Sequence, residues 1–406
     1  MTRSPQTRIV YLNHTGLVSG AERVLVNMLH GLDRSRYEPF VICPAEGNLS
    51  TLIQAEDVEC VAAPAVVARF TWRPDRLWKA IVSLGKAVAA VRQRLAWLDP
   101  DLVHANTLRA GIIASLAAIG TGRLVIWHVH DILPNHPLSA AIRFFAWSMR
   151  RTQIIAVSHA TANSFCGPLP FGNRVHVIHN GTDLSEFPLK QCGNTEFRKR
   201  MGIPEEAFLV CAVGQICARK GLLELLEAFE RTSESAPQMH LAIAGKVVFA
   251  HEERYFESLL RAVAEPGMSG RVHFTGEVRD VSGLLQAADL LVLNSRQEPF
   301  GLVLVEAMAS GTPVLATRVG GIPEIVEDAR NGWLVEKDDT AALSRKLVEL
   351  SQDRGLLERI AQAAHYETCP QFSLERFQSR LHSLYAEIIP SHRLAIERAH
   401  STSPCQ

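Results

Sequence analysis

Two glutamates, Glu298 and Glu306, enclose a Pro-Phe-Gly turn and an almost wholly apolar run in the stretch EPFGLVLVEAMASG. A carboxylate accepts hydrogen bonds from hydroxyl groups, and a ribose offers a 2′,3′-hydroxyl pair. If a helix begins at Gly301 or Leu302, Glu306 lies roughly 7.5 Å along its axis. A nucleotide with its phosphates at the helix start could then place its ribose at Glu306 and an attached sugar at Glu298. The alternative is a capping glutamate and an exposed one, with no ligand.

The elements around these glutamates place them where ligands bind in open α/β sheets. DLLVLNS predicts a strand, RQEPF the loop after it, and a helix that ends at Gly311 before Pro313. Ligands bind beyond the carboxyl ends of such strands, where the amides at the start of the next helix attract anions. Because Gly301 has no side chain, a phosphate or sugar can approach the backbone closely there.

A second candidate anion site lies in VGQICARKGLLELL, where Arg219 and Lys220 end a loop that follows a strand. Cations at this point could neutralise a departing diphosphate without a metal ion. The alternative is two solvated cations before a helix. The loop is not a P-loop, because the pattern G-x-x-x-x-G-K-[ST] is absent.

The first half carries weaker signals. Gly20 belongs to a glycine-containing loop, NHTGLVSGAERV, that lacks the G-x-G-x-x-G pattern of dinucleotide binding and is also compatible with a simple strand-to-helix turn. VIWHVHDIL places His128, His130 and Asp131 at the end of a strand. We expect His128 to be structural and His130 to face a cleft. The DPD sequence at 99–101 is interpreted as a turn before a strand.

Short β-rich runs alternate with helical patterns along the whole chain, which is typical of parallel sheets covered by helices. Both halves open with a strand, a glycine-containing loop and a helix. We therefore expect an α/β protein with two Rossmann-like domains. Asn-Gly, acidic turns and Pro188 interrupt the periodicity over 179–197 and mark the boundary. The expected parts are domains over 1–185 and 186–365, a helix over 366–389 and a flexible tail over 390–406.

The composition is that of a globular protein inside the cell. A chain of 406 residues suits two domains, and 47% hydrophobic residues supply ample material for buried sheets. The eight cysteines show no C-x-x-C pair and no metal-ligand spacing, so we expect neither a disulfide framework nor a metal site. Without a signal-peptide core or a run of roughly 20 apolar residues, a cytoplasmic location is expected. The formal net charge is zero, although the first half is basic and the second acidic, and no nucleic-acid partner is expected.

These motifs together resemble the retaining glycosyltransferases of family 4, also called glycosyl transferases group 1, which have the GT-B fold. The resemblance rests on Glu298 and Glu306 as an E-x7-E pair, on GTPVLATRVGGIPEIV after it, and on VGQICARKG, VIHNGTDLSEF and SGAERV before it. It is specific over about residues 205–335 and looser over the first half. It implies two domains whose parallel sheets face a cleft, and a C-terminal helix that crosses back to the first domain.

The resemblance also implies roles for individual residues. Glu306 would bind the ribose hydroxyls of the donor, Glu298 the hydroxyls of the donor sugar, and Lys220 the diphosphate. His130 would contact the donor sugar and phosphate, so that His130, Lys220 and Glu298 are the expected catalytic residues. The remaining donor contacts would come from Gly20, Arg219, Val278, Phe300, Gly301 and Leu302.

One position departs from the family pattern. The family often has an arginine directly after the glycine of the VGQICARKG loop, where this chain has Gln215. Glutamine cannot supply that positive charge. Either Arg219 compensates for it, or the leaving group is held less tightly.

The implied activity is transfer of a sugar from a UDP- or GDP-sugar to a glycan or lipid-linked acceptor, with retention of anomeric configuration and without a cofactor or metal. Segments 69–79 and 143–153 mix cations with aromatic residues, which suits contact with an anionic membrane at its inner face. Amphipathic helices packed on the sheet are the alternative for these segments. The alternative functions are a sugar-nucleotide epimerase of the same fold, a glycoside hydrolase and a non-catalytic nucleotide-sugar-binding partner.

Overall fold

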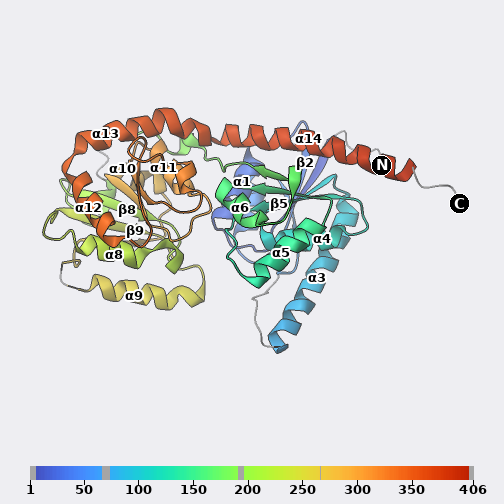
Figure 1. Cartoon of the computed structure of the whole chain (residues 1–406), viewed down its shortest axis with the longest axis horizontal. Coiled ribbons are helices and arrows are strands. Elements are labelled where there is room, and N and C mark those ends of the chain that lie inside the picture. The colour runs from blue at the N-terminus through green and yellow to red at the C-terminus, as the bar shows by residue number, and fades with distance from the viewer. Residues whose placement is uncertain (1–5, 66–73, 191–195, 266, 402–406) are drawn as a thin grey trace. The chain divides into compact units, whose positions relative to one another are not determined.

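The computed structural model describes residues 6–401 except 66–73, 191–195 and 266. Contacts between residues divide the chain into two compact units (Figure 1). Unit 1 comprises Met1–Gly181 and Leu374–Gln406, and unit 2 comprises Thr182–Ser373.

These boundaries differ from the expected ones, which followed residues 185 and 365. The chain leaves unit 1 earlier and returns later because the two ends of unit 2 pair with each other. Thr182 forms a parallel β-bridge with Ser373 and donates its N–H to the carbonyl oxygen of Phe372 at 3.0 Å. Local sequence gives no sign of a contact between residues so far apart in the chain.

Unit 1 is built on a sheet of seven parallel strands in the order β3-β2-β1-β4-β5-β6-β7. β4 and β5 are buried along their whole length, as expected when helices cover both faces of a parallel sheet. The strands are β1 (Thr7–Leu12), β2 (Tyr37–Cys43), β3 (Glu59–Ala62), β4 (Leu102–Ala105), β5 (Leu124–Val129), β6 (Thr152–Ala156) and β7 (Val175–Val177). The helices between them are α1 (Gly20–His30), α2 (Leu49–Ala55), α3 (Pro74–Leu98), α4 (Leu108–Ala118), α5 (Pro137–Ser148) and α6 (His159–Cys166).

Unit 2 repeats this plan with six parallel strands in the order β10-β9-β8-β11-β12-β13. The strands are β8 (Phe208–Val213), β9 (Met239–Ala244), β10 (Val272–Gly276), β11 (Leu290–Leu293), β12 (Val314–Thr317) and β13 (Trp333–Val335). The helices are α7 (Glu196–Met201), α8 (Leu222–Glu230), α9 (Glu253–Val263), α10 (Val281–Ala287), α11 (Leu302–Ala309), α12 (Thr340–Gln352) and α13 (Arg354–Ala363).

Both sheets reverse their strand order at the first strand of the unit. β1 lies between β2 and β4, and β8 lies between β9 and β11. The chain connections therefore leave these two strands in opposite directions, which opens a crevice at the carboxyl ends of β1 and β4 and of β8 and β11. Ligands of open α/β sheets bind in such crevices.

The C-terminal helix, α14 (Leu374–Ser401), belongs to unit 1, which confirms the expected return to the first domain. It is drawn in red in Figure 1. The apolar face that we expected from the sequence is buried and includes Leu374, Phe377, Leu381, Leu384 and Tyr385.

The same helix is longer than expected. We placed its end at residue 389, but α14 continues past Pro390 to Ser401. A proline removes one backbone hydrogen bond from a helix. His392 Nε2 lies 2.7 Å from the carbonyl oxygen of Gly122, and this contact helps to hold the helix on unit 1 just beyond the proline. The rest of the expected tail, 402–406, lies outside the described residues.

α3 and α14 are long, with 25 and 28 residues, but length alone does not make a membrane span. Within the described part of the chain, neither these helices nor any other is apolar enough over a sufficient length to cross a membrane.

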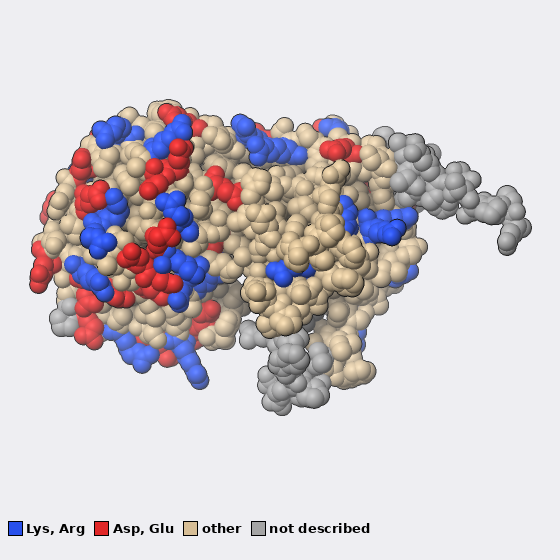
Figure 2. All heavy atoms as spheres, in the orientation of Figure 1, with Lys and Arg blue, Asp and Glu red and all other residues tan. Residues whose placement is uncertain are grey.

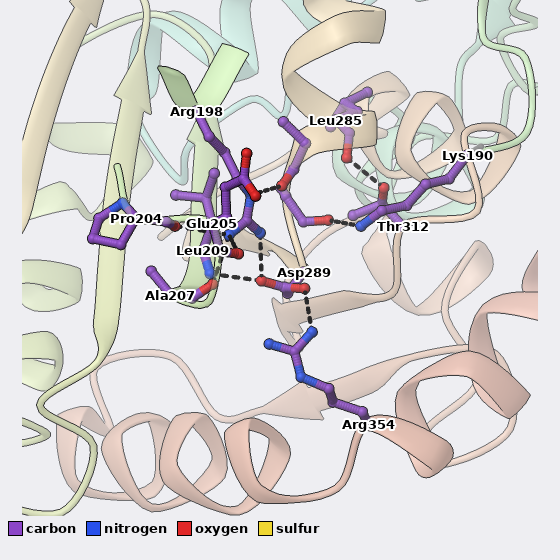
Figure 3. A network of polar contacts seen from close by, with 12 residues as sticks. Lys190, Arg198, Pro204, Glu205, Ala207, Leu209, Leu285, Asp289, Thr312 and Arg354 are labelled. Carbon is purple, nitrogen blue, oxygen red and sulfur yellow. Dashed lines mark hydrogen bonds and ion pairs between the residues drawn. The ribbon is translucent and has the colours of Figure 1, made fainter. Parts of the chain in front are cut away.

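A buried ion pair lies at the amino ends of the strands of unit 2, opposite the crevice (Figure 3). Arg198 donates to Asp289 Oδ2 at 2.7 Å, and the N–H of Leu209 donates to the same oxygen at 2.8 Å. The exposed fractions of the Arg198 and Asp289 side chains are 8% and 9%. Arg198 also donates to the carbonyl oxygens of Pro204, Glu205, Ala207 and Ala287. The pair therefore joins α7 to the amino ends of β8 and β11.

Candidate active site

The loop after β8 is fixed to the end of β11 by glycine geometry. Gly214 follows β8 with φ +148°, and Gly221 ends the loop with φ +60° at the start of α8. Positive φ values favour glycine. A side chain at Gly221 would clash with the backbone carbonyl oxygen of Asn294. The side-chain Nδ2 of Asn294 in turn donates to the carbonyl oxygen of Gly221 at 2.8 Å. The two loops that border the unit 2 crevice thus hold each other in place.

Lys220 and Glu298 meet between these loops. Lys220 Nζ donates to Glu298 Oε2 at 2.6 Å, and Ser295 Oγ donates to the same oxygen at 3.0 Å. The exposed fractions of the lysine and glutamate side chains are 14% and 9%. The backbone oxygen of Glu298 accepts the N–H of Gly321 at 2.9 Å. Because an ammonium group has three N–H bonds, Lys220 keeps donors for an anion beside Glu298.

The charges around Glu298 keep it ionised. Burial alone would raise the pKa of Glu298, but the positive charges of Lys220 and Arg219 outweigh burial and hold the pKa below its ordinary value. Arg219 is exposed, and its Nη1 donates to the carbonyl oxygen of Gln297 at 3.2 Å. The arginine thus lies next to the glutamate loop. Its compensation for Gln215 stays a prediction.

A pocket lies beside this ion pair at the carboxyl ends of β8, β9 and β11. Its wall includes Gly214, Gln215, Lys220, Ala244 and Asn294. Backbone, amide and ammonium groups therefore surround a space that is also lined by apolar strand residues.

The helix after this loop, α11, begins at Leu302, as expected. Gly301 has φ +104°, which explains why a glycine precedes the helix. Phe300 is buried, and its ring centroid lies 5.7 Å from that of Phe372, which anchors the turn. Leu302 and Glu306 are half-buried on the first turns of α11. Phe300, Gly301, Leu302 and Glu306 therefore follow the loop that carries Glu298.

Val278 lies further away along the same edge of the sheet. It is half-buried in the loop after β10, the outermost strand, which is separated from β8 by β9. Each of these residues of unit 2 thus follows a parallel strand and lies toward the carboxyl edge of one sheet. Whether each contacts a donor stays a prediction.

Gly20 and His130, the other two expected site residues, belong to unit 1. Gly20 is the first residue of α1, where Ser19 Oγ donates to Glu22 Oε2 at 2.6 Å. Glu22 is buried and also accepts Asn13 Nδ2 at 3.0 Å. We missed Glu22 and Asn13 in the sequence, although S-x-x-E at 19–22 is the signature of a helix capping box.

His130 directly follows β5 and lies against a buried histidine. Its ring centroid lies 4.2 Å from that of His128, which is fully buried, as expected. Burial lowers the pKa of His130 to about 3, so its imidazole is neutral at neutral pH. The Nε2 atom of the buried His104 lies 3.2 Å from His128 Nδ1. His104 was not predicted from the sequence, because a single histidine in the strand sequence LVHA gives no functional signal.

Comparisons with known proteins agree with this architecture. Residues 193–366 match the family described as Glycosyl transferases group 1, and residues 18–186 match Glycosyltransferase Family 4. The chain is 26% identical over 317 residues to N-acetyl-alpha-D-glucosaminyl L-malate synthase of Bacillus anthracis, which covers 76% of this chain and 79% of that protein. It is 32% identical over 233 residues to D-inositol 3-phosphate glycosyltransferase of Streptomyces avermitilis, which covers 56% of this chain and 50% of that protein.

Among solved structures, Anabaena HepE in complex with UDP-glucose superimposes with a TM-score of 0.80 at 26% identity, and the match covers 94% of this chain and 100% of that chain. The two parallel sheets with their C-terminal helix have the GT-B fold, and the class of protein is a glycosyltransferase. More narrowly, the chain belongs to the group 1, or family 4, glycosyltransferases. The expected fold class and family are thereby confirmed.

Proposed function

We propose that this protein is a retaining glycosyltransferase that moves a sugar from a UDP- or GDP-sugar to a glycan or lipid-linked acceptor, without a metal ion or other cofactor. The observation that carries the proposal is the Lys220–Glu298 pair at the crevice of unit 2. It offers a cation and a carboxylate within one hydrogen bond of each other. A nucleotide-sugar presents the matching groups, a diphosphate bonded directly to a sugar that carries hydroxyls.

The donor would lie along the loop and the first turns of α11. Its diphosphate would bind Lys220 and the backbone N–H groups at the start of the helix, which attract anions. Glu298 would accept hydrogen bonds from the sugar, and Glu306 from the ribose. The backbone at Val278 would contact the nucleobase, and His130 of unit 1 would contact the sugar and phosphate as a neutral imidazole.

The reaction breaks the bond between the anomeric carbon and a diphosphate oxygen. The electron pair stays on the diphosphate, where Lys220 and Arg219 stabilise the developing negative charge. The acceptor hydroxyl forms the new bond on the face from which the diphosphate leaves, which retains the configuration. Its proton passes to the departing phosphate oxygen. A metal ion is not needed if these cations and the helix amides suffice.

The relatives support the class of donor. The HepE structure contains UDP-glucose, and the two curated relatives are named for transfer or addition of sugar units. A sugar-nucleotide epimerase of the same fold would use a similar donor pocket and is the alternative. It differs in a measurable way, because an epimerase converts the donor without an acceptor.

We also propose a cytoplasmic location with contact to an anionic membrane, as suits a lipid-linked acceptor. Trp78 of α3 and Phe144 of α5 have exposed fractions of 67% and 58%. Figure 2 shows few acidic side chains on the face of unit 1 in view, over α4 and α5. Residues 69–73 of the first basic-aromatic segment lie outside the described residues.

The second basic-aromatic segment is partly used inside the unit. Arg143 donates to the carbonyl oxygens of Ser164 and Leu133 at 2.9 and 3.4 Å, so its charge serves packing. The alternative of ordinary helix packing therefore holds for this arginine. The proposed membrane contact relies on the exposed aromatic residues and on the exposed cations Lys79, Arg150 and Arg151.

A nucleotide screen followed by a transfer assay tests the proposed function. Thermal unfolding is recorded in EDTA with UDP, GDP, ADP and their glucose derivatives, since a ligand of the native state raises the unfolding temperature. We expect either the uridine nucleotides or the guanosine nucleotides to raise the unfolding temperature. In the transfer assay, we expect nucleotide release to require an acceptor and to continue in EDTA. Loss of activity in EDTA that magnesium or manganese restores would overturn metal independence. Conversion of the donor alone would establish the epimerase, and the absence of any nucleotide effect would refute a donor site.

A further inference from the structure

A chain of buried polar contacts links α14 to the histidines at the end of β5. Tyr385 Oη lies 2.6 Å from His104 Nδ1, and His104 Nε2 lies 3.2 Å from His128 Nδ1. Tyr385, His104 and His128 are all fully buried. The ring of His128 in turn lies against the ring of His130. The contacts therefore run from the C-terminal helix through β4 and β5 to a proposed donor contact.

The sheet register explains how these side chains meet. His104 of β4 pairs with Ile126 of β5, so the two side chains point to the same face of the sheet. Side chains alternate along a strand, which places His128 on that face as well. Tyr385 reaches the same face from α14. The line of imidazoles is thus a consequence of strand register together with the docking of one helix.

Because these groups are neutral, the hydrogen bonds can run in one of two orders. Burial raises the pKa of Tyr385 well above its ordinary value, so the hydroxyl keeps its proton. Burial lowers the pKa of His104 to about 3, so this imidazole is neutral and carries one N–H. If Tyr385 donates to Nδ1, His104 must carry its proton on Nε2 and donate it to His128 Nδ1.

The opposite order is the alternative. His128 would donate to His104, and His104 to Tyr385, whose hydroxyl would then need its own acceptor. The polar atom available is Tyr11 Oη, at 3.5 Å, which is beyond the usual range for an O–H···O bond. The first order, however, leaves the Nε2–H of His128 without a partner among the described residues, so each order leaves one donor poorly paired. In either order His104 and His128 carry the proton on the same ring nitrogen.

We propose that Tyr385 and His104 are positioning residues for His130, because the Tyr385 hydroxyl sets the tautomers of His104 and His128, against which His130 packs. The inference rests on the proposed function, in which His130 contacts the donor. The Nε2 atoms of His128 and His130 are buried and have no hydrogen-bond partner among the described residues. We infer that the contacts of His104 with His128 and of Tyr385 with His104 orient these rings. Tyr385 is the residue that α14 contributes.

A pair of hydroxyl deletions tests this assignment. Tyr385→Phe removes the hydroxyl that hydrogen-bonds to His104 and keeps the ring. Tyr37→Phe is the matched control, because Tyr37 packs edge-on against Tyr385 with centroids 5.8 Å apart, and its own buried hydroxyl has no hydrogen-bond partner among the described residues. Both variants are labelled with ¹⁵N-histidine, and the tautomer of each imidazole is read from its nitrogen chemical shifts. Thermal unfolding checks that the variants fold.

In the wild type and in Tyr37→Phe we expect one tautomer, the same at His104 and at His128. In Tyr385→Phe we expect mixed tautomers at both, with kcat lower by about tenfold, the effect of one hydrogen bond, and an unchanged KM for the donor. Unchanged histidine shifts in Tyr385→Phe would overturn the proposal, as would equal effects of Tyr37→Phe. If the wild type transfers no sugar at all, the proposed function fails, while the nitrogen shifts still decide whether Tyr385 sets the tautomers.

Discussion

Lys220 and Glu298, which lie 78 residues apart in the sequence, are joined by a hydrogen bond of 2.6 Å between nearly buried side chains. The sequence predicted separate tasks for them, phosphate binding by the lysine and sugar binding by the glutamate. Their direct contact means that the two tasks are coupled. A change that moves the lysine also moves the carboxylate that would orient the sugar.

Replacement of Lys220 by alanine should reduce turnover more than stability. A donor that acts on charge developing in the transition state typically contributes about 10²–10³ in rate, so kcat should fall by that factor. Lys220→Arg should recover part of the activity if charge alone matters, although a planar guanidinium fits a point-charge site poorly. Steady-state kinetics with the identified donor and acceptor measure both effects.

The surface lysine Lys246, which pairs with the exposed Glu277 at 2.6 Å, is the matched control, and Lys246→Ala should be silent. Arg219→Ala asks a separate question. A loss comparable to that of Lys220→Ala would mean that Arg219 supplies the charge missing at Gln215. Near wild-type turnover in Lys220→Ala would remove this loop from the mechanism.

Replacement of Glu306 by alanine should weaken donor binding. Hydrogen bonds that involve a charged group contribute roughly 1.5–3 kcal/mol, and we expect a loss in that range. Isothermal titration calorimetry with the nucleotide and the nucleotide-sugar measures it. Glu358→Ala, which removes an exposed carboxylate of α13, is the control and should leave the affinity unchanged. Equal affinities of Glu306→Ala and the wild type would assign Glu306 a role in the helix only.

Asp289→Asn should destabilise unit 2, because it leaves the buried guanidinium of Arg198 without its counter-ion. Removal of one partner of a buried ion pair typically costs about 3–5 kcal/mol. Chemical denaturation measures the loss, and Glu349→Gln on the surface, where Glu349 pairs with Lys346, is the control. A change below about 0.5 kcal/mol, the usual range for surface substitutions, would show that Arg198 finds compensation.

Acidification should destabilise unit 1 through its buried histidines. In the unfolded chain His104 binds a proton as the pH falls through about 6.5, whereas the folded pKa is about 3. Between these values the unfolded state binds more protons, so the free energy of unfolding falls with decreasing pH, by up to about 1.4 kcal/mol per pH unit and imidazole. Denaturation midpoints between pH 7 and pH 5 should show this trend.

The His104→Gln variant isolates the contribution of one imidazole. It should unfold more easily at pH 7, yet depend less steeply on pH than the wild type. An unchanged slope in His104→Gln would mean that this histidine does not titrate between the two states.

The cations of the two basic-aromatic segments predict salt-sensitive binding to anionic vesicles, to which their exposed aromatic residues add apolar contact. Surface electrostatics are screened within about 8 Å at physiological ionic strength, so co-sedimentation should be stronger at low salt. Trp78→Ala and Phe144→Ala should reduce it, whereas Tyr366→Ala, which removes an exposed aromatic ring of unit 2, should not. No co-sedimentation at low salt would favour an acceptor that is not presented by a membrane.

The local rules of sequence predicted the fold and the edge of the sheet on which the site lies. The start of α11 was predictable because a glycine separates the loop from an apolar run, and Gly301 indeed adopts a φ that favours glycine. The end of α14 was not, because a proline usually interrupts a helix, and the contact of His392 with Gly122 beyond Pro390 joins residues that are distant in the sequence. The unit boundary at Gly181 was missed for a similar reason, since it depends on pairing between distant residues.

The candidate site shows the same division between local and long-range information. Glu298 and Lys220 were identifiable because each follows a buried strand and has a side chain suited to a nucleotide-sugar. Their bond to each other was not, because it depends on the adjacency of β8 and β11. His104 was missed entirely, since its partner Tyr385 lies on a helix 281 residues further along the chain.

The bridge between Thr182 and Ser373 has a further consequence. Unit 2 is one continuous stretch of sequence whose first and last residues are neighbours. In topological terms it is a domain inserted between the two segments of unit 1. Termini that lie side by side permit excision and transplantation of such a segment, as domain insertion and circular permutation exploit in other proteins. The half that carries Lys220 and Glu298 can thus be exchanged between relatives as a cassette, with two adjacent junctions.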